Sequence, residues 1–170
     1  MLKLQFSVAI RVMALVLGLF VGAVQADPPP KYNFLDYDDG LAQAKKLRKP
    51  VFVYFGRYGC AWCDKTNRET FSDAKLRKLY SDHYVLVYVD TESNKRLTLP
   101  TGERLSEAEL GHRFKIFATP LFVFLDPAGN TLLKVPGFKT GADFRDYDRY
   151  IIGGHYKTQP LLKFLEKSRS

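Results

Sequence analysis

The chain has 170 residues, 46% of them hydrophobic, which is enough for one domain with a hydrophobic core. Its formal net charge is +8, but the basic residues are spread along the sequence, which favours solvated helix faces over a nucleic-acid-binding surface. It contains two cysteines, too few for a disulfide framework or for a four-sulfur metal site.

The first 26 residues are expected to be a cleaved secretory signal peptide. Lys3 and Arg11 supply positive charge, and Val12 to Val24 is a run of 13 apolar residues and glycines that ends near the small residue Ala26. A membrane-spanning helix needs about 20 apolar residues, so cleavage after Ala26 is favoured over an uncleaved anchor. Two basic residues leave with this segment, and the mature charge becomes 24 − 18, or +6. We expect a periplasmic location.

The remaining chain reads as a flexible lead-in, residues 27–33, followed by one domain over residues 34–170. Apolar periodicity, caps and turns predict the helices and strands. In the first half these are a helix from Gly40 to about Arg48 capped by Asp38 and Asp39, a strand Val51–Phe55, a helix over residues 60–69, a second helix beginning at Ser72-Asp73, and a strand Tyr84–Val89. The strand–helix–strand order predicts that the two strands are parallel.

The second half begins with a polar stretch, Asp90 to Leu105, that we interpret as an insertion or long loop. The elements expected after it are a helix from a capping box of Ser106 and Glu109 to Phe114, a strand Leu121–Leu125, an antiparallel partner Thr131–Val135, a helix from about Ala142 to Ile152, and a last helix Leu161–Lys167 docked through Leu161, Leu162 and Leu165.

Both cysteines belong to one motif, Cys60-Ala61-Trp62-Cys63, placed where a buried strand gives way to a helix. A helix N-terminus favours thiolate over thiol and so lowers the pKa of Cys60. We therefore expect Cys60, at the exposed end, to be the nucleophile and the more buried Cys63 to resolve the mixed disulfide. A bridge across two residues adds little stability, because the entropic gain grows with loop length. Trp62 is expected either to give partners a flat apolar contact or simply to pack on the helix.

Two further features bear on the chemistry. A zinc site would need two more ligands, and His83, His112 and His155 are not paired at ligand spacing, so no metal and no cofactor are expected. Thr119-Pro120 directly precedes a buried apolar strand, which indicates either a strand-start proline or a cis-proline loop packed beside the cysteines.

Over nearly all of residues 34–167 the chain resembles the thioredoxin superfamily. The segments that carry the resemblance are Val51–Phe55, Cys60–Cys63, Tyr84–Asp90 and Ala118–Phe124. Within the superfamily it looks most like the exported SoxW-type thioredoxins, on the strength of the signal peptide, Pro100–Glu103 and Val135–Phe138.

The resemblance implies an α/β fold with a central mixed β-sheet flanked by helices in a single domain. It also implies that Pro120 is cis and that the backbone at Thr119 pairs with an extended segment of the partner. Thr119, Pro120 and Trp62 are thus the expected substrate-binding residues. The implied partners are a disulfide-containing periplasmic protein and a membrane thiol-electron transporter that acts as reductant. No nucleic acid is expected, and the protein is expected to be a monomer.

Two departures from the family pattern affect this hypothesis. The buried aspartate that often relays protons is Tyr54 here, and the tryptophan that often precedes the first cysteine is Gly59. The expected activity is reduction of partner disulfides through Cys60 and Cys63. The alternatives are an oxidase or isomerase of folding proteins, and a binding module that keeps the fold without catalysis.

Overall fold

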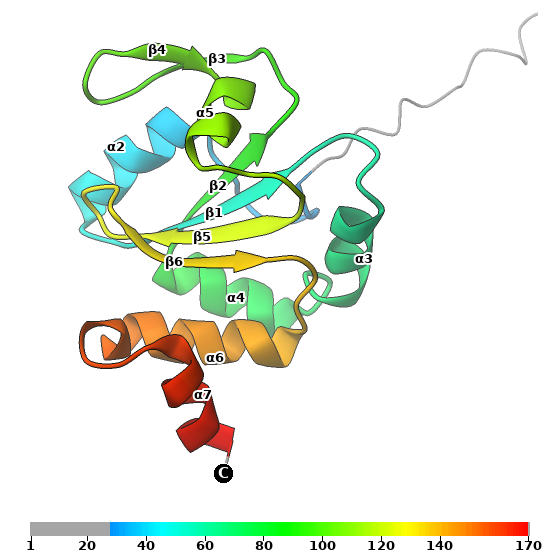
Figure 1. The fold of residues 1–170 in the computed structure, drawn as a ribbon, viewed down its shortest axis with the longest axis vertical. Helices are drawn as coiled ribbons and strands as arrows, with labels where there is room; N and C mark the ends of the chain where they lie inside the picture. The colour runs from blue at the N-terminus through cyan, green and yellow to red at the C-terminus, as the bar shows by residue number, and fades with distance from the viewer. Residues whose placement is uncertain (1–27, 170) are drawn as a thin grey trace, which may run out of the picture.

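The computed structural model describes residues 28–169, so the predicted signal peptide, residues 1–26, lies outside the described residues. At the centre is a four-stranded sheet in the order β2–β1–β5–β6 (Figure 1). The strands are β1 (Val51–Gly56), β2 (Val85–Asp90), β5 (Leu121–Leu125) and β6 (Thr131–Pro136). β1 pairs with β2 in parallel and with β5 in antiparallel fashion, and β5 pairs with β6 as an antiparallel hairpin. The mixed sheet, the parallel pair and the hairpin confirm the prediction.

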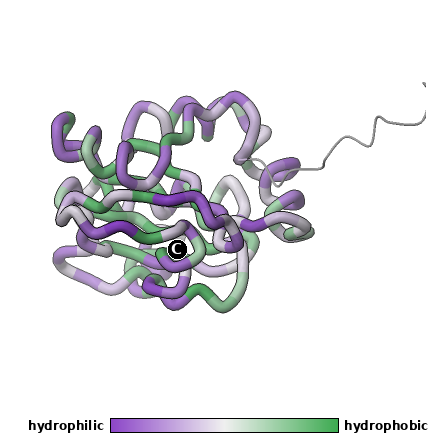
Figure 2. The backbone as a smooth tube through the Cα atoms, turned by 90° about the horizontal axis from the view of Figure 1, so that it is seen from above, coloured by the Kyte–Doolittle hydropathy of each residue, from purple (hydrophilic) through white to green (hydrophobic). Residues whose placement is uncertain are grey.

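The central strands are buried on both faces, and their side chains alternate between two cores. Phe52 and Tyr54 point into one core, while Val51, Val53 and Phe55 point into the other. This alternation follows from the two-residue period of a strand. Hydrophobic segments accordingly run through the middle of the chain trace, with hydrophilic segments around them (Figure 2).

Helices cover both faces of the sheet (Figure 1). The first core is closed by α3 (Ala61–Glu69), α4 (Ala74–His83), α6 (Gly141–Ile152) and α7 (Leu161–Arg169), and a short 3-10 helix, η1 (His155–Lys157), joins the last two. The second core is closed by α2 (Tyr37–Leu47), α5 (Glu107–Arg113) and a small hairpin of β3 (Arg96–Thr98) and β4 (Arg104–Ser106). Within residues 28–169, no helix has the length and apolar character needed to cross a membrane.

The predicted capping box is present, with Ser106 and Glu109 each accepting the other's backbone N–H. Other expectations were wrong in detail. The segment expected to be a loop, residues 90–105, contains the β3–β4 hairpin, because Leu97 and Leu105 are buried in the second core. Strands of three residues are too short to show a pattern in the sequence.

Two further corrections concern helix ends and faces. The N-cap of α2 is Asp36, not Asp38 or Asp39, and Asp38 instead accepts the backbone N–H of Thr98 in the hairpin at 2.9 Å. In α7, Leu161 and Leu165 pack against the first core as expected, whereas Leu162 is 74% exposed and the buried anchor of this helix is Phe164. The expected docking face was therefore wrong for Leu162 and lacked Phe164.

Candidate functional site: a disulfide at a helix N-terminus

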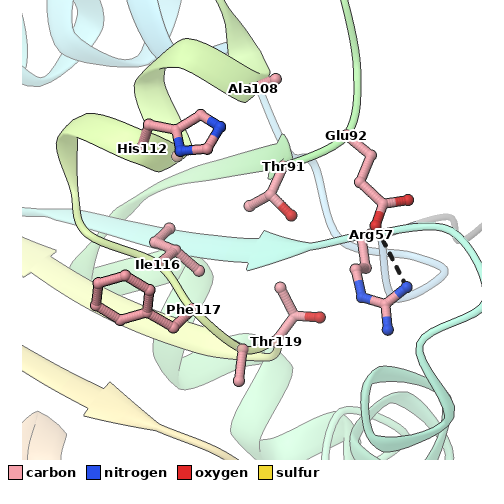
Figure 3. A pocket seen from close by; sticks show the side chains of 10 residues that line it. Arg57, Thr91, Glu92, Ala108, His112, Ile116, Phe117 and Thr119 are labelled. Carbon is pink, nitrogen blue, oxygen red and sulfur yellow. Dashed lines mark hydrogen bonds and ion pairs between the residues drawn. The ribbon is translucent and has the colours of Figure 1, made fainter.

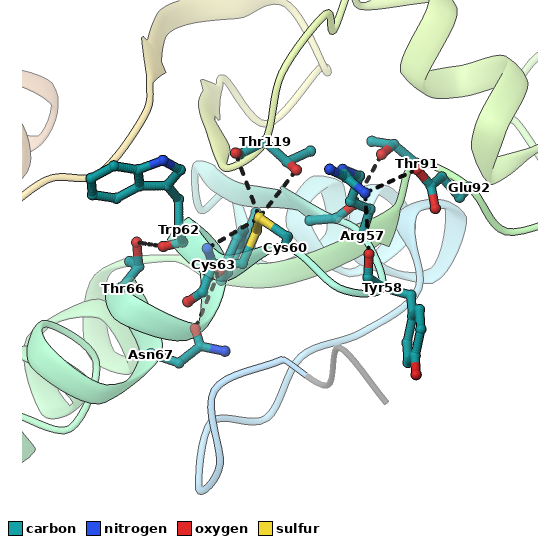
Figure 4. The surroundings of a disulfide bond; sticks show 12 residues. Arg57, Tyr58, Cys60, Trp62, Cys63, Thr66, Asn67, Thr91, Glu92 and Thr119 are labelled. Atoms are coloured by element: carbon teal, nitrogen blue, oxygen red, sulfur yellow. Dashed lines mark hydrogen bonds and ion pairs between the residues drawn. A yellow bond between two sulfur atoms is a disulfide. The ribbon is translucent and has the colours of Figure 1, made fainter. Parts of the chain in front are cut away.

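The two cysteines form a disulfide at the point where β1 leads into α3 (Figure 4). Cys60 is the N-cap of α3, and Cys63 lies in its first turn with its Cα 5.2 Å from that of Cys60. Gly59, directly before Cys60, has a φ of +66°, a left-handed conformation that glycine adopts without a steric penalty. The predicted position of the motif between a buried strand and a helix is confirmed.

The sulfur of Cys60 lies among polar groups that favour negative charge. It accepts the backbone N–H of Cys63 at 3.1 Å and the hydroxyl of Thr119 at 3.2 Å, and the Thr119 carbonyl oxygen is 3.5 Å away (Figure 4). These donors add to the positive end of the α3 dipole. After reduction, the two donors, the Cys63 N–H and the Thr119 hydroxyl, would stabilise the Cys60 thiolate, whereas the Thr119 carbonyl oxygen is an acceptor and would not.

The expectation that Cys60 is clearly more exposed than Cys63 was wrong. The two residues are 4% and 3% exposed, because the loop that contains Thr119 covers the start of α3. The two sulfurs therefore differ by their hydrogen bonds and not by their exposure. One donor to Cys60 Sγ is the local N–H of Cys63, and the other is Thr119, which is 59 residues away in sequence.

The loop that contacts Cys60 is held in a defined position. The peptide bond between Thr119 and Pro120 is cis, and the Pro120 carbonyl accepts the N–H of Gly137 at 2.8 Å. The registers of β5 with both neighbours begin at Leu121. Thr119 therefore lies beside the disulfide but outside the sheet ladder.

Tyr54 occupies the position under the disulfide where relatives often carry an acid. Its hydroxyl lies 3.2 Å from Asn67 Oδ1 and 3.4 Å from the Cys63 carbonyl oxygen, and it can donate to one of them at a time. Burial raises the pKa of Tyr54 far above its ordinary value of 10.0. This phenol remains protonated at neutral pH, so it braces α3 against β1 and does not act as a base.

Exposed aromatic side chains surround the disulfide. Trp62 is 58% exposed, and its ring lies 6.3 Å from that of Phe138, over which Lys65 Nζ sits at 4.8 Å. Tyr58 is 57% exposed, and Phe117, close to Thr119 in the same loop, is 94% exposed. Trp62 was expected from the sequence to be a contact residue, whereas Phe117 was not. The signal that could have revealed Phe117 was an apolar pair, Ile116-Phe117, directly before Ala118-Thr119-Pro120.

A charged pair on the opposite side of the loop was also missed. Arg57, three residues before Cys60, lies 3.4 Å from Glu92, which follows the end of β2.

Among residues 28–169, no group of three or more His, Cys, Asp and Glu side chains is arranged to hold a metal ion.

Comparison with curated proteins finds relatives that match part of this chain. The chain is 28% identical over 110 residues to the thiol:disulfide interchange protein DsbD of Ralstonia nicotianae, a match that covers 64% of this chain and 16% of that protein. It is 31% identical over 65 residues to spermatogenesis-associated protein 20 of Mus musculus, covering 36% of this chain and 8% of that protein. The chain thus spans less than a fifth of the length of these relatives.

Solved structures with the same fold include a thioredoxin-fold protein from Helicobacter pylori, with a TM-score of 0.64 and 23% identity over 71% of this chain and 82% of that one. A thioredoxin from Thermus thermophilus has a TM-score of 0.59 and 26% identity over 71% of this chain and 87% of that one. The model of the thioredoxin-like domain matches residues 37–152, more than half of the sequence. The chain therefore belongs to the thioredoxin-like domain family.

Proposed function

We propose that this protein is an exported thiol–disulfide oxidoreductase that reduces disulfides of periplasmic partner proteins. The observation that carries the proposal is the Cys60–Cys63 disulfide at the start of α3, with two hydrogen-bond donors directed at Cys60 Sγ. The similarity to a thiol:disulfide interchange protein supports the same reaction class. The SoxW-type assignment remains a finer hypothesis within this class.

The reaction begins from the reduced protein. The Cys60 thiolate attacks one sulfur of the partner disulfide, which forms a mixed disulfide and releases the partner's other sulfur as a thiolate that takes up a proton. Cys63 then loses its proton and attacks Cys60 Sγ, which restores the internal disulfide and releases the second partner thiol. Two electrons pass to the partner, and a membrane thiol-electron transporter would return them.

The residues around the sulfurs have separate roles in this proposal. The backbone of Thr119, outside the ladder of β5, would pair with an extended segment of the partner, and Pro120 would hold that backbone in place. Trp62 would offer an exposed apolar surface next to Cys60. Because Tyr54 is no base, the proton of Cys63 would leave to water or to the departing partner thiolate.

The test uses Cys63→Ser, with Cys60→Ser as the matched control. In the first variant Cys60 can attack an insulin disulfide but no internal thiol resolves the product, so we expect a mixed disulfide between Cys60 and one insulin cysteine to accumulate when the reduced variant meets insulin without added dithiothreitol. In the assay with dithiothreitol, where the reductant itself must cleave that bond, we expect turnover to fall. The control should form no mixed disulfide. Unimpaired turnover in Cys63→Ser would contradict the assigned roles, and a parent protein with no acceleration at all would indicate a non-catalytic binding module.

The direction of electron flow is tested by the reduction potential. Proteins of this kind range from about −270 mV for reductants to about −120 mV for strong oxidants. Equilibration with dithiothreitol redox buffers should place this protein towards the reducing end. A value at the oxidising end would favour an oxidase of folding proteins over the proposed reductase.

A further inference from the structure

A cavity of about 300 Å³ lies outside the carboxyl ends of the parallel strands β1 and β2, next to Thr119 (Figure 3). Its walls come from four segments, the end of β1, the loop after β2, α5 and the loop before β5, and include Arg57, Thr91, Glu92, His112, Phe117 and Thr119. The volume is at the lower end of the range for small-molecule sites. The carboxyl ends of parallel strands are also where open α/β sheets bind ligands.

Thr119 links the cavity to the reactive sulfur. It lines the cavity, and its hydroxyl is 3.2 Å from Cys60 Sγ. A ligand that extends from the cavity past the Thr119 side chain would bring its own sulfur towards Cys60. A small disulfide with polar ends has this shape.

The charges in the cavity suit a ligand that carries both signs. Arg57 and Glu92 meet through one contact of 3.4 Å, longer than a good hydrogen bond, and their side chains are 44% and 57% exposed. Both side chains line the cavity, and Arg57 also donates to the Tyr58 carbonyl oxygen at 3.3 Å. A ligand with a single charge would contact only one of the two groups. A carboxylate next to an ammonium, as in an α-amino acid group, would pair with both.

Hydrogen bonds fix the backbone segment that carries Glu92. Thr91 donates its N–H and its hydroxyl to the Gly56 carbonyl at 2.9 and 3.1 Å, which ties the loop after β2 to the end of β1. Glu92 donates its N–H to Asp90 Oδ1 at 2.9 Å. The backbone that carries Glu92 is thus positioned before any ligand binds, which reduces the entropic cost of binding.

We propose that this cavity binds the amino-acid end of a low-molecular-weight disulfide and that the reduced protein reduces such compounds. The inference rests on the proposed function, since it uses the same two cysteines. The Cys60 thiolate attacks the small disulfide, and one small thiolate leaves and is protonated. Cys63 then loses its proton and attacks Cys60 Sγ, and the second small thiol departs. The protein is oxidised from dithiol to disulfide, and one small disulfide becomes two thiols.

The experiment compares two small disulfides with the reduced full-length protein. Glutathione disulfide carries amino-acid groups, whereas bis(2-hydroxyethyl) disulfide carries no charge. The rate constant for each is measured by the fluorescence of Trp62, the single tryptophan, as the protein is oxidised. The ratio of the two constants reports recognition of the charged ends, and differences in intrinsic reactivity cancel when variants are compared with the parent.

In Arg57→Gln and in Glu92→Gln we expect this ratio to fall by about three- to tenfold, the effect of one partly exposed charged contact. The matched control is Arg113→Gln. Arg113 lies on α5, which lines the cavity, but it is not a lining residue itself, and its exposed ion pair with Glu103 spans 2.6 Å. Loss of this ion pair should leave the parental ratio unchanged.

Two outcomes would overturn the inference while the proposed function stands. One is a ratio of the two rate constants that stays at the parental value in both Arg57→Gln and Glu92→Gln. The other is a fall in the rate of insulin reduction as large as the fall in the ratio, which would assign the cavity to protein partners. A reduced parent protein that reacts with neither small disulfide but reduces insulin would also overturn the inference alone, whereas one that reduces neither insulin nor the small disulfides would refute the proposed function as well.

Discussion

The hydroxyl of Thr119 should control the acidity of Cys60, and Thr119→Val tests this. The substitution keeps the shape of the side chain and the backbone but removes the donor 3.2 Å from Cys60 Sγ. A hydrogen bond to a charged acceptor contributes about 1.5–3 kcal/mol. Because Thr119 is only half-buried, we take the lower end, and about 1.4 kcal/mol corresponds to one pH unit. We therefore expect the pKa of Cys60 in the reduced protein to rise by about one pH unit.

The same loss should change the reduction potential. The hydroxyl stabilises the thiolate of the reduced protein more than the uncharged disulfide, so its removal favours the oxidised state. For a two-electron couple, about 1.4 kcal/mol corresponds to about 30 mV. The potential of Thr119→Val should therefore become more negative by up to about 30 mV at a pH where the parent Cys60 is ionised.

The assay is the ultraviolet absorbance of the thiolate as a function of pH, together with equilibration in dithiothreitol buffers. Thr119→Ser, which keeps the hydroxyl, should restore both values towards those of the parent. Thr158→Val is a suitable control, because it removes a hydroxyl with a hydrogen bond of the same length, 3.2 Å, to His155 in the connection between α6 and α7. A parental pKa in Thr119→Val would refute the view that this hydroxyl serves the Cys60 thiolate.

Three further predictions follow from the packing and the buried polar groups. Tyr54→Phe should lower the free energy of unfolding by about 1 kcal/mol in urea denaturation, through loss of the one hydrogen bond that the hydroxyl donates to Asn67 or to the Cys63 carbonyl oxygen. It should leave insulin reduction within about twofold of the parent, and a loss of about tenfold or more would show that the phenol has a proton-transfer role. Phe144→Ala should lower the free energy of unfolding by about 3–5 kcal/mol, because this fully buried ring lies 4.9 Å from the ring of Phe122 and 5.0 Å from that of Phe71. Phe117→Ala, at an exposed ring, should lower it by less than about 0.5 kcal/mol. Equal losses in the two variants would contradict the assigned core. Glu107 is 5% exposed, and its burial raises its pKa above the ordinary value of 4.5. As pH rises, the unfolded state therefore loses this proton before the folded state does. The contribution of Glu107 to stability consequently falls between the pKa of the unfolded state and the higher pKa of the folded state. Glu107→Gln should reduce this part of the pH dependence of unfolding, and an unchanged profile would count against it.

The sequence by itself determined most of the fold and the identity of the reactive group. Continuous apolar strands at Val51–Phe55 and Leu121–Leu125 can be read because strands buried on both faces carry no alternation. The capping box at Ser106 and the N-cap position of Cys60 are local patterns, because their hydrogen bonds join residues three positions apart. The three-residue strands β3 and β4 were missed, because their formation depends on burial of Leu97 and Leu105 against distant helices.

Only the tertiary structure decided how the site is completed. The side-chain donor to Cys60 Sγ is Thr119, which the sheet brings to Cys60 from 59 residues away. The cavity formed by Arg57, Glu92 and α5 likewise joins segments that no sequence pattern relates. Periodicity and spacing report interactions within one element, whereas contacts across the sheet follow from strand order and register, which are fixed by packing of the whole domain.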